Sequence, residues 1–131
     1  MSIEYAVVFE KFAESHYIKL FEKKHKKGWA ITRQAVTAEL QRIEALIGRN
    51  AYIEVICDRD GIKILKMEFR VAGTQESRHG SGNRCIIALR EEISTAFVLL
   101  VYGKTDVRGS RETDWWKAMI REHYPEYGKL I

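Results

Sequence analysis

The chain has 131 residues, of which 46% are hydrophobic, with one proline and a formal net charge of +4. This length and composition exclude an intrinsically disordered chain and predict a single folded domain over residues 1–131. There is no run of about 18 apolar residues and no basic start of the signal-peptide type, so we expect a cytoplasmic protein without a membrane contact.

The hydrophobic pattern predicts elements in the order β-α-α-β-β-β-β-α. We expect a strand at 5–9, helices at 11–26 and 32–47 separated by a break at Gly28, strands at 51–57 and 62–71, a strand pair within 83–104, and a last helix at 112–123. This order favours an α+β fold, in which an antiparallel β-meander carries an N-terminal helical hairpin and a C-terminal helix, with the helices on one face.

Residues 62–71 alternate between apolar and charged side chains, which is typical of a strand with one buried face. The apolar set is Leu65, Met67, Phe69 and Val71, and the charged set is Lys66, Glu68 and Arg70. Arg84 begins the next strand and Lys104 ends the one after it. A meander can therefore gather these charges on one surface. That surface is either a solvated face with ordinary salt bridges or a phosphate-binding surface, since guanidinium groups match phosphate oxygens.

Basic residues cluster in the segment 11–33. They include Lys23, Lys24, Lys26 and Lys27, and only two glutamates accompany them. Such a cluster fits a polyanion or an acidic protein partner, and it equally fits a solvated helix face.

Motifs for metals, nucleotide cofactors and nucleophilic serine are absent from the sequence. We therefore expect no metal site and no cofactor. The two cysteines, Cys57 and Cys85, lie in apolar strand-like runs and are interpreted as buried free thiols. The polar, glycine-rich segment 72–82 is predicted to be a loop, and it carries His79.

The element order and three segments of the chain resemble the RelE/ParE superfamily of toxins from type II toxin–antitoxin systems. The segments are Ile64–Arg70, Asn83–Ile87 and Val98–Lys104, and the resemblance covers roughly residues 5–123. The helix after Lys104 is similar to that of the HigB-like branch.

The resemblance implies a metal-independent endoribonuclease that cuts messenger RNA, often in the ribosomal A site, and so inhibits translation. In that family the 2′-hydroxyl attacks the adjacent phosphate while basic residues stabilise the transition state. Lys66, Arg84 and Lys104 match basic positions of the family. Tyr102 and Tyr124 are the candidates for its C-terminal tyrosine. Arg70 and the lysines of the basic segment are expected to contact RNA.

Glu68 stands where the family has a second lysine. One interpretation is altered chemistry, with Glu68 as general base and His79 or Lys104 as general acid. The other is that Glu68 only pairs with Arg84 or Lys66.

The resemblance also implies a cognate antitoxin protein that covers the basic face and that is either acidic itself or brings acidic residues to this surface. Two alternatives to the nuclease remain open. One is a ParE-like toxin that acts on DNA gyrase through protein contact, and the other is a non-catalytic module that binds RNA or protein.

Overall fold

The computed structural model describes residues 3–107, 109 and 111–131 of the chain. Its elements are β1 (Ala6–Phe9), α1 (Lys11–Ala13), a π-helical turn η1 (Glu14–Ile18), α2 (Lys19–His25), α3 (Lys27–Gln41), α4 (Ile43–Leu46), β2 (Ile53–Arg59), β3 (Ile62–Phe69), α5 (Arg78–Ser81), β4 (Asn83–Arg90), η2 (Glu91–Ile93), β5 (Thr95–Tyr102), η3 (Lys104–Asp106), α6 (Glu112–His123) and α7 (Pro125–Gly128). The five strands and the longer helices follow each other in the predicted order, and the structure adds two short helices that were not predicted, α5 between β3 and β4 and α7 after α6.

The strands form one sheet in the order β1-β5-β4-β3-β2. Strands β2 to β5 make the antiparallel meander that the sequence predicts. Strand β1, by contrast, pairs in parallel with β5, and the helices α1 to α4 carry the chain from β1 at one edge of the sheet to β2 at the other. The protein is therefore an α+β fold built on a mixed sheet.

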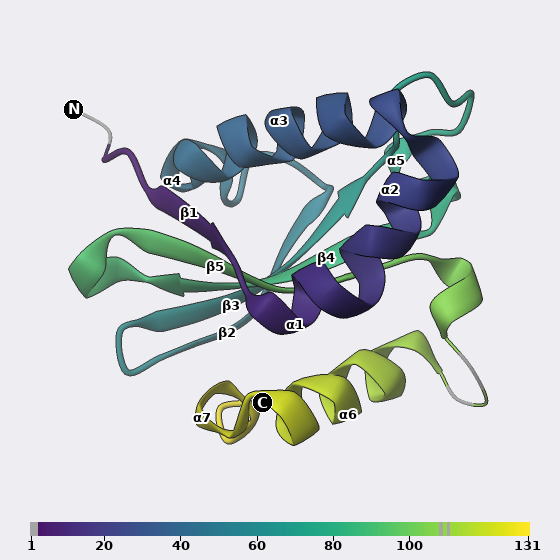
Figure 1. Cartoon of the computed structure of the whole chain (residues 1–131). Helices are drawn as coiled ribbons and strands as arrows, with labels where there is room; N and C mark the ends of the chain where they lie inside the picture. Colours follow the sequence, from purple (N-terminus) through teal and green to yellow (C-terminus); the bar gives the residue numbers. More distant parts are fainter. Residues whose placement is uncertain (1–2, 108, 110) are drawn as a thin grey trace.

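Helices cover both faces of this sheet (Figure 1). Trp29, Val36 and Leu40 from α3 pack on one face, whereas Trp116 and Ile120 from α6 pack on the other. The prediction that all helices share one face was wrong. The central strands explain this, since β4 is apolar on both sides and both sides therefore need to be covered.

The N-terminal helices turn at Lys26 and not at the predicted Gly28. Lys26 has a φ of +48° between α2 and α3, whereas Gly28 lies inside α3. A Cβ atom at Gly28 would lie 2.7 Å from the carbonyl oxygen of Ala72. Glycine is needed there for close packing of α3 against the segment after β3, so it does not act as a helix break.

The C-terminal helix α6 has the predicted bounds, and Pro125 begins the short helix α7. Both cysteines are free thiols, with Cys85 buried and Cys57 half-buried. None of the helices in the described part of the chain is both long and apolar enough to span a membrane.

Burial predicts which leucines stabilise the fold. Leu40 on α3 is completely buried, whereas Leu20 on α2 is 54% exposed. We expect Leu40→Ala to lower the free energy of unfolding by about 2–5 kcal/mol, because it leaves a cavity. The matched control Leu20→Ala should change it by no more than about 0.5 kcal/mol. Urea denaturation measures both, and equal losses would contradict the packing of α3 described above.

Candidate functional site

A pocket of about 300 Å³ lies on the α6 face of the sheet, where β3 ends and β4 begins. We call it the Glu68 pocket. Its lining residues are Ala51, Tyr52, Glu54, Lys66, Glu68, His79, Arg84 and Glu112. It thus brings together four of the five catalytic residues predicted from the sequence, and Lys104 is the one that lies elsewhere.

Strand register places the central residues of this pocket side by side. Glu68 on β3 pairs with Arg84 on β4, and Arg84 pairs with Tyr102 on β5. Directly opposed residues of antiparallel strands point to the same face of a sheet. A carboxylate, a guanidinium and a phenol therefore form one row across three neighbouring strands.

Glu68 contacts two basic side chains through a single oxygen. Its Oε2 lies 2.7 Å from Nδ1 of His79 and 2.9 Å from Nη2 of Arg84. The Glu68 side chain is 16% exposed, whereas that of His79 is 88% exposed. Since the carboxylate accepts a hydrogen bond from Nδ1, the other ring nitrogen, Nε2, is the one that a bound molecule can reach.

Arg84 is buried, and backbone carbonyl groups surround its guanidinium. Besides the contact with Glu68, it donates hydrogen bonds to the carbonyl oxygens of Arg78 (3.3 Å), His79 (3.1 Å) and Asn83 (3.0 Å). The donors of a buried guanidinium need hydrogen-bond partners, because an unpaired charge away from water would strongly destabilise the folded state. Arg84 thus fixes the α5 turn at the end of the sheet and orients Glu68. Because its donors are used in this way, we interpret Arg84 as a positioning residue and not as one that contacts a ligand directly.

Arg78 holds the α5 turn from the other side. Its guanidinium pairs with Glu39 of α3 at 3.1 Å and lies 3.9 Å from the ring centroid of Tyr52. It also donates a hydrogen bond to the carbonyl oxygen of Glu68. The segment 72–82, which the sequence predicts to be a loop, is therefore held in place at His79, because its neighbour Arg78 is anchored to the sheet and to α3.

A second cluster closes the pocket on the side of α6. Glu112 Oε2 accepts hydrogen bonds from Nζ of Lys66 (3.1 Å) and from the hydroxyl of Tyr102 (2.8 Å). Tyr102 is completely buried, and burial together with the Glu112 carboxylate raises the pKa of its phenol. The phenol therefore stays protonated and acts as a hydrogen-bond donor.

Opposing effects act on the pKa of Glu112. Burial raises it, but the hydrogen bonds from Tyr102 and Lys66 and the positive charges of Lys66 and Arg84 lower it by more. Its pKa therefore lies below the usual value for a glutamate. Such a carboxylate stabilises the folded state above its unfolded pKa, and this stabilisation is lost as the pH falls through the folded pKa.

Two residues predicted for this surface lie elsewhere. Lys104 is exposed and donates a hydrogen bond of 2.6 Å to the carbonyl oxygen of Gly80, in a different pocket. Arg70 lines a cavity under α3, on the opposite face from Lys66 and Glu68. The alternation predicted for Arg70 fails because β3 ends at Phe69.

The basic residues of the N-terminal segment are exposed. Lys23 and Lys24 lie at the end of α2, and Lys26 and Lys27 lie at the turn into α3. The end of α2 runs beside α5 (Figure 1), and Lys24 lines a pocket together with Ser81 of α5. Positive charge is thus available next to the turn that carries His79.

Sequence reasoning missed Glu112 and Arg78. Nothing in the sequence around Glu112 distinguishes it from other acidic residues at the start of a helix. Arg78 precedes His79 in a segment whose composition predicts a loop, and only its tertiary partners reveal its role. Tyr102, a candidate, has its hydroxyl on Glu112, whereas that of Tyr124 donates to the carbonyl oxygen of Leu99.

Across residues 3–107, 109 and 111–131 there is no cluster of three or more His, Cys, Asp or Glu side chains that is arranged to hold a metal ion.

No protein-family model matches the chain, and no curated protein shows a significant match.

The hydrogen bond from Tyr102 gives a direct test of the Glu112 cluster. In Tyr102→Phe we expect the pKa of Glu112 to rise towards its usual value, and the free energy of unfolding at neutral pH to fall by about 1 kcal/mol. The acid side of the stability curve should then move to higher pH. Titration of the Glu112 carboxyl carbon by NMR measures the pKa. The control Tyr124→Phe removes a hydroxyl on the same face and should leave that pKa unchanged; a Tyr102→Phe variant with an unaltered Glu112 pKa would contradict the cluster.

Proposed function

We propose that the protein is a metal-independent endoribonuclease of the RelE toxin type, which cuts messenger RNA and thereby inhibits translation. The observation that carries this proposal is the contact of 2.7 Å between Glu68 and the exposed His79 in a pocket that also contains Lys66. A carboxylate and an imidazole in contact supply the two proton transfers that RNA cleavage needs.

The reaction starts when Glu68 accepts the proton of a ribose 2′-hydroxyl. The 2′ oxygen then forms a bond to the adjacent phosphorus atom, and the bond from phosphorus to the 5′ oxygen breaks. Protonated His79 gives its proton to that 5′ oxygen. The products are a 2′,3′-cyclic phosphate and a 5′-hydroxyl end, so atoms and protons balance without a further reactant.

Lys66 and Arg84 contribute positive charge to this reaction in different ways. The side chain of Lys66 is 18% exposed, lines the pocket and is directed by Glu112, so its ammonium group is the one placed to contact the phosphate. Arg84 is buried and acts through Glu68, which it orients. Preorganised charge of this kind stabilises the additional negative charge of the transition state.

The exposed lysines at the end of α2 extend the positive surface beyond the pocket. Lys23, Lys24, Lys26 and Lys27 would bind the phosphates of an RNA strand or the surface of a ribosome. An acidic antitoxin would bind the same surface and so block access to the pocket. These partners belong to the proposal, and they place the protein in the cytoplasm, where messenger RNA is translated.

A binding module without catalysis is the second candidate. One observation favours it, because both cations of the pocket already have carboxylate partners, Lys66 with Glu112 and Arg84 with Glu68. Such a module would bind RNA in a salt-dependent way and produce no cleavage products.

Cleavage of a labelled single-stranded RNA, followed in EDTA with and without ribosomes, tests the proposal. We expect Glu68→Gln and His79→Ala each to reduce the cleavage rate by about 10²–10⁴-fold, since each removes one proton transfer. Growth arrest on induction should be relieved in parallel. The matched control Glu22→Gln changes an exposed carboxylate on α2 and should cleave like the wild type.

Circular dichroism should show that the variants remain folded, because His79 is exposed and glutamine keeps the shape of Glu68. Full activity of both variants would rule out this pocket as the active site. A wild-type protein that binds RNA but leaves it intact under all these conditions would establish the non-catalytic module instead.

A further inference from the structure

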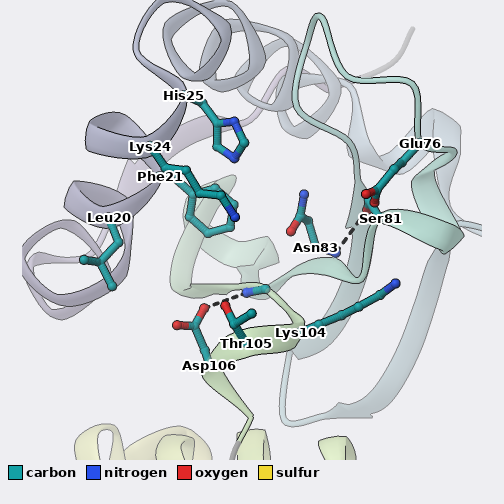
Figure 2. A pocket seen from close by; sticks show the side chains of 11 residues that line it. Leu20, Phe21, Lys24, His25, Glu76, Ser81, Asn83, Lys104, Thr105 and Asp106 are labelled. Atoms are coloured by element: carbon teal, nitrogen blue, oxygen red, sulfur yellow. Dashed lines mark hydrogen bonds between the residues drawn. The ribbon is translucent and has the colours of Figure 1, made fainter.

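A second pocket, of about 270 Å³, lies on the other side of the α5 turn, on the face of the sheet that α2 and α3 cover. We call it the Asn83 pocket. Figure 2 shows its lining, which comes from α2, the segment around α5, the start of β4 and η3: Leu20, Phe21, Lys24, His25, Glu76, Ser81, Asn83, Gly103, Lys104, Thr105 and Asp106. This volume is slightly below the range of roughly 300–1,000 Å³ for drug-sized ligands, so the pocket suits one ring system.

The carboxamide of Asn83 is the central polar group of this pocket. In Figure 2 it extends between Phe21 and His25 on one side and Ser81 and Glu76 on the other. Its backbone is fixed, because the amide donates to Oγ of Ser81 at 3.0 Å and the carbonyl accepts from Arg84. Within the described part of the chain no hydrogen bond occupies the carboxamide itself. A half-buried amide of this kind offers one acceptor and two donors to a ligand.

Aromatic rings from α2 form the adjacent wall. Phe21 and His25 are stacked with their centroids 6.0 Å apart and an interplanar angle of 27°. Burial, and to a smaller extent Lys24, lowers the pKa of His25, so its ring is neutral at neutral pH. Flat, uncharged rings next to a carboxamide are suited to a planar group that also forms hydrogen bonds.

The charges around the pocket favour a neutral ligand over a free anion. Lys24 and Lys104 are balanced by Glu76 and Asp106, and Lys104 already donates to the carbonyl oxygen of Gly80. A phosphate group in the pocket would meet both carboxylates. A neutral heterocycle would not be repelled by these carboxylates, and no charged group of the ligand would have to be removed from water.

We propose that the Asn83 pocket binds one nucleobase of a single-stranded RNA, with the Asn83 carboxamide reading the edge of the base and the Phe21–His25 wall contacting its ring. The inference rests on the proposed function, because it takes RNA as the substrate. A carboxamide pairs with two atoms of adenine, N6 and N7, so we expect adenine to bind most tightly.

The position of the pocket connects this base to the proposed reaction. Asn83 and Arg84 are consecutive on β4, and they point to opposite faces of the sheet, one towards each pocket. The α5 turn, with His79 on the Glu68 side and Ser81 on the Asn83 side, separates the two. An RNA strand that crosses this turn would place a phosphate at Glu68 and a neighbouring base at Asn83.

Titration with the four ribonucleoside 5′-monophosphates tests the pocket without any cleavage. We expect adenosine monophosphate to bind most tightly and ribose 5-phosphate, which lacks a base, not to bind. Asn83→Ala should weaken the binding of adenosine monophosphate about tenfold and abolish the preference among bases, as for the loss of one or two hydrogen bonds. The control Gln34→Ala removes an exposed carboxamide on α3 and should change nothing.

Gly103→Ala provides a second variant that fills the pocket. Gly103 has a φ of −119°, which alanine adopts without strain, and the added Cβ would lie 3.0 Å from Oδ1 of Asn83 and 3.7 Å from Phe21. We expect it to weaken nucleotide binding while the far-ultraviolet circular dichroism stays unchanged.

Two results would overturn the inference: ribose 5-phosphate binding as tightly as the nucleotides, or Asn83→Ala and Gly103→Ala both binding them like the wild type. Glu68→Gln separates this failure from that of the nuclease. It should reduce the cleavage rate by about 10²–10⁴-fold and leave nucleotide binding intact. If the wild type binds adenosine monophosphate through Asn83 and yet never cuts RNA, the base pocket stands and the nuclease proposal falls.

Discussion

The buried guanidinium of Arg84 is the constraint on which the rest of the site depends. A cation that is only 5% exposed needs partners for its donors, and Arg84 finds them in three backbone carbonyls and the carboxylate of Glu68. Those carbonyls belong to the α5 turn and to the start of β4. The same interaction that satisfies the buried charge therefore sets the position of His79 relative to Glu68.

In the Glu68 pocket, each of the two carboxylates, Glu68 and Glu112, is held by a buried side chain and also contacts a second, basic side chain. Glu112 holds Lys66 in place and receives the hydroxyl of a buried tyrosine, while Glu68 is held by a buried arginine and contacts the exposed His79. The groups that fix the two carboxylates, Tyr102 for Glu112 and Arg84 for Glu68, are buried, so water does not compete for these hydrogen bonds. The proposed cleavage of RNA would need preorganisation of this kind, because the reacting groups would then not have to be reoriented during proton transfer.

The α5 turn links the two pockets. It is only four residues long, yet it is held by Arg84 on the Glu68 side, by Lys104 on the Asn83 side and by the ion pair of Arg78 with Glu39 of α3. Glycine at position 82 is part of this arrangement, because its φ of +73° closes the turn and a Cβ atom there would clash with the Lys104 side chain. The arrangement gives Lys104 a role in supporting the turn, in a place where the sequence suggested a catalytic cation.

Alternation along 62–71 determined that Lys66 and Glu68 share a face, and the hydrophobic pattern determined the order of elements and the α+β class. These properties are local, since they depend on the period of one strand and on the turns that bound it. Tertiary structure alone decided that β1 joins the sheet in parallel, that α6 covers the second face, and that Glu112 comes to Lys66. It also separated Arg70 and Lys104 from the pocket, because the end of a strand and the path of a turn depend on packing partners far away in the sequence.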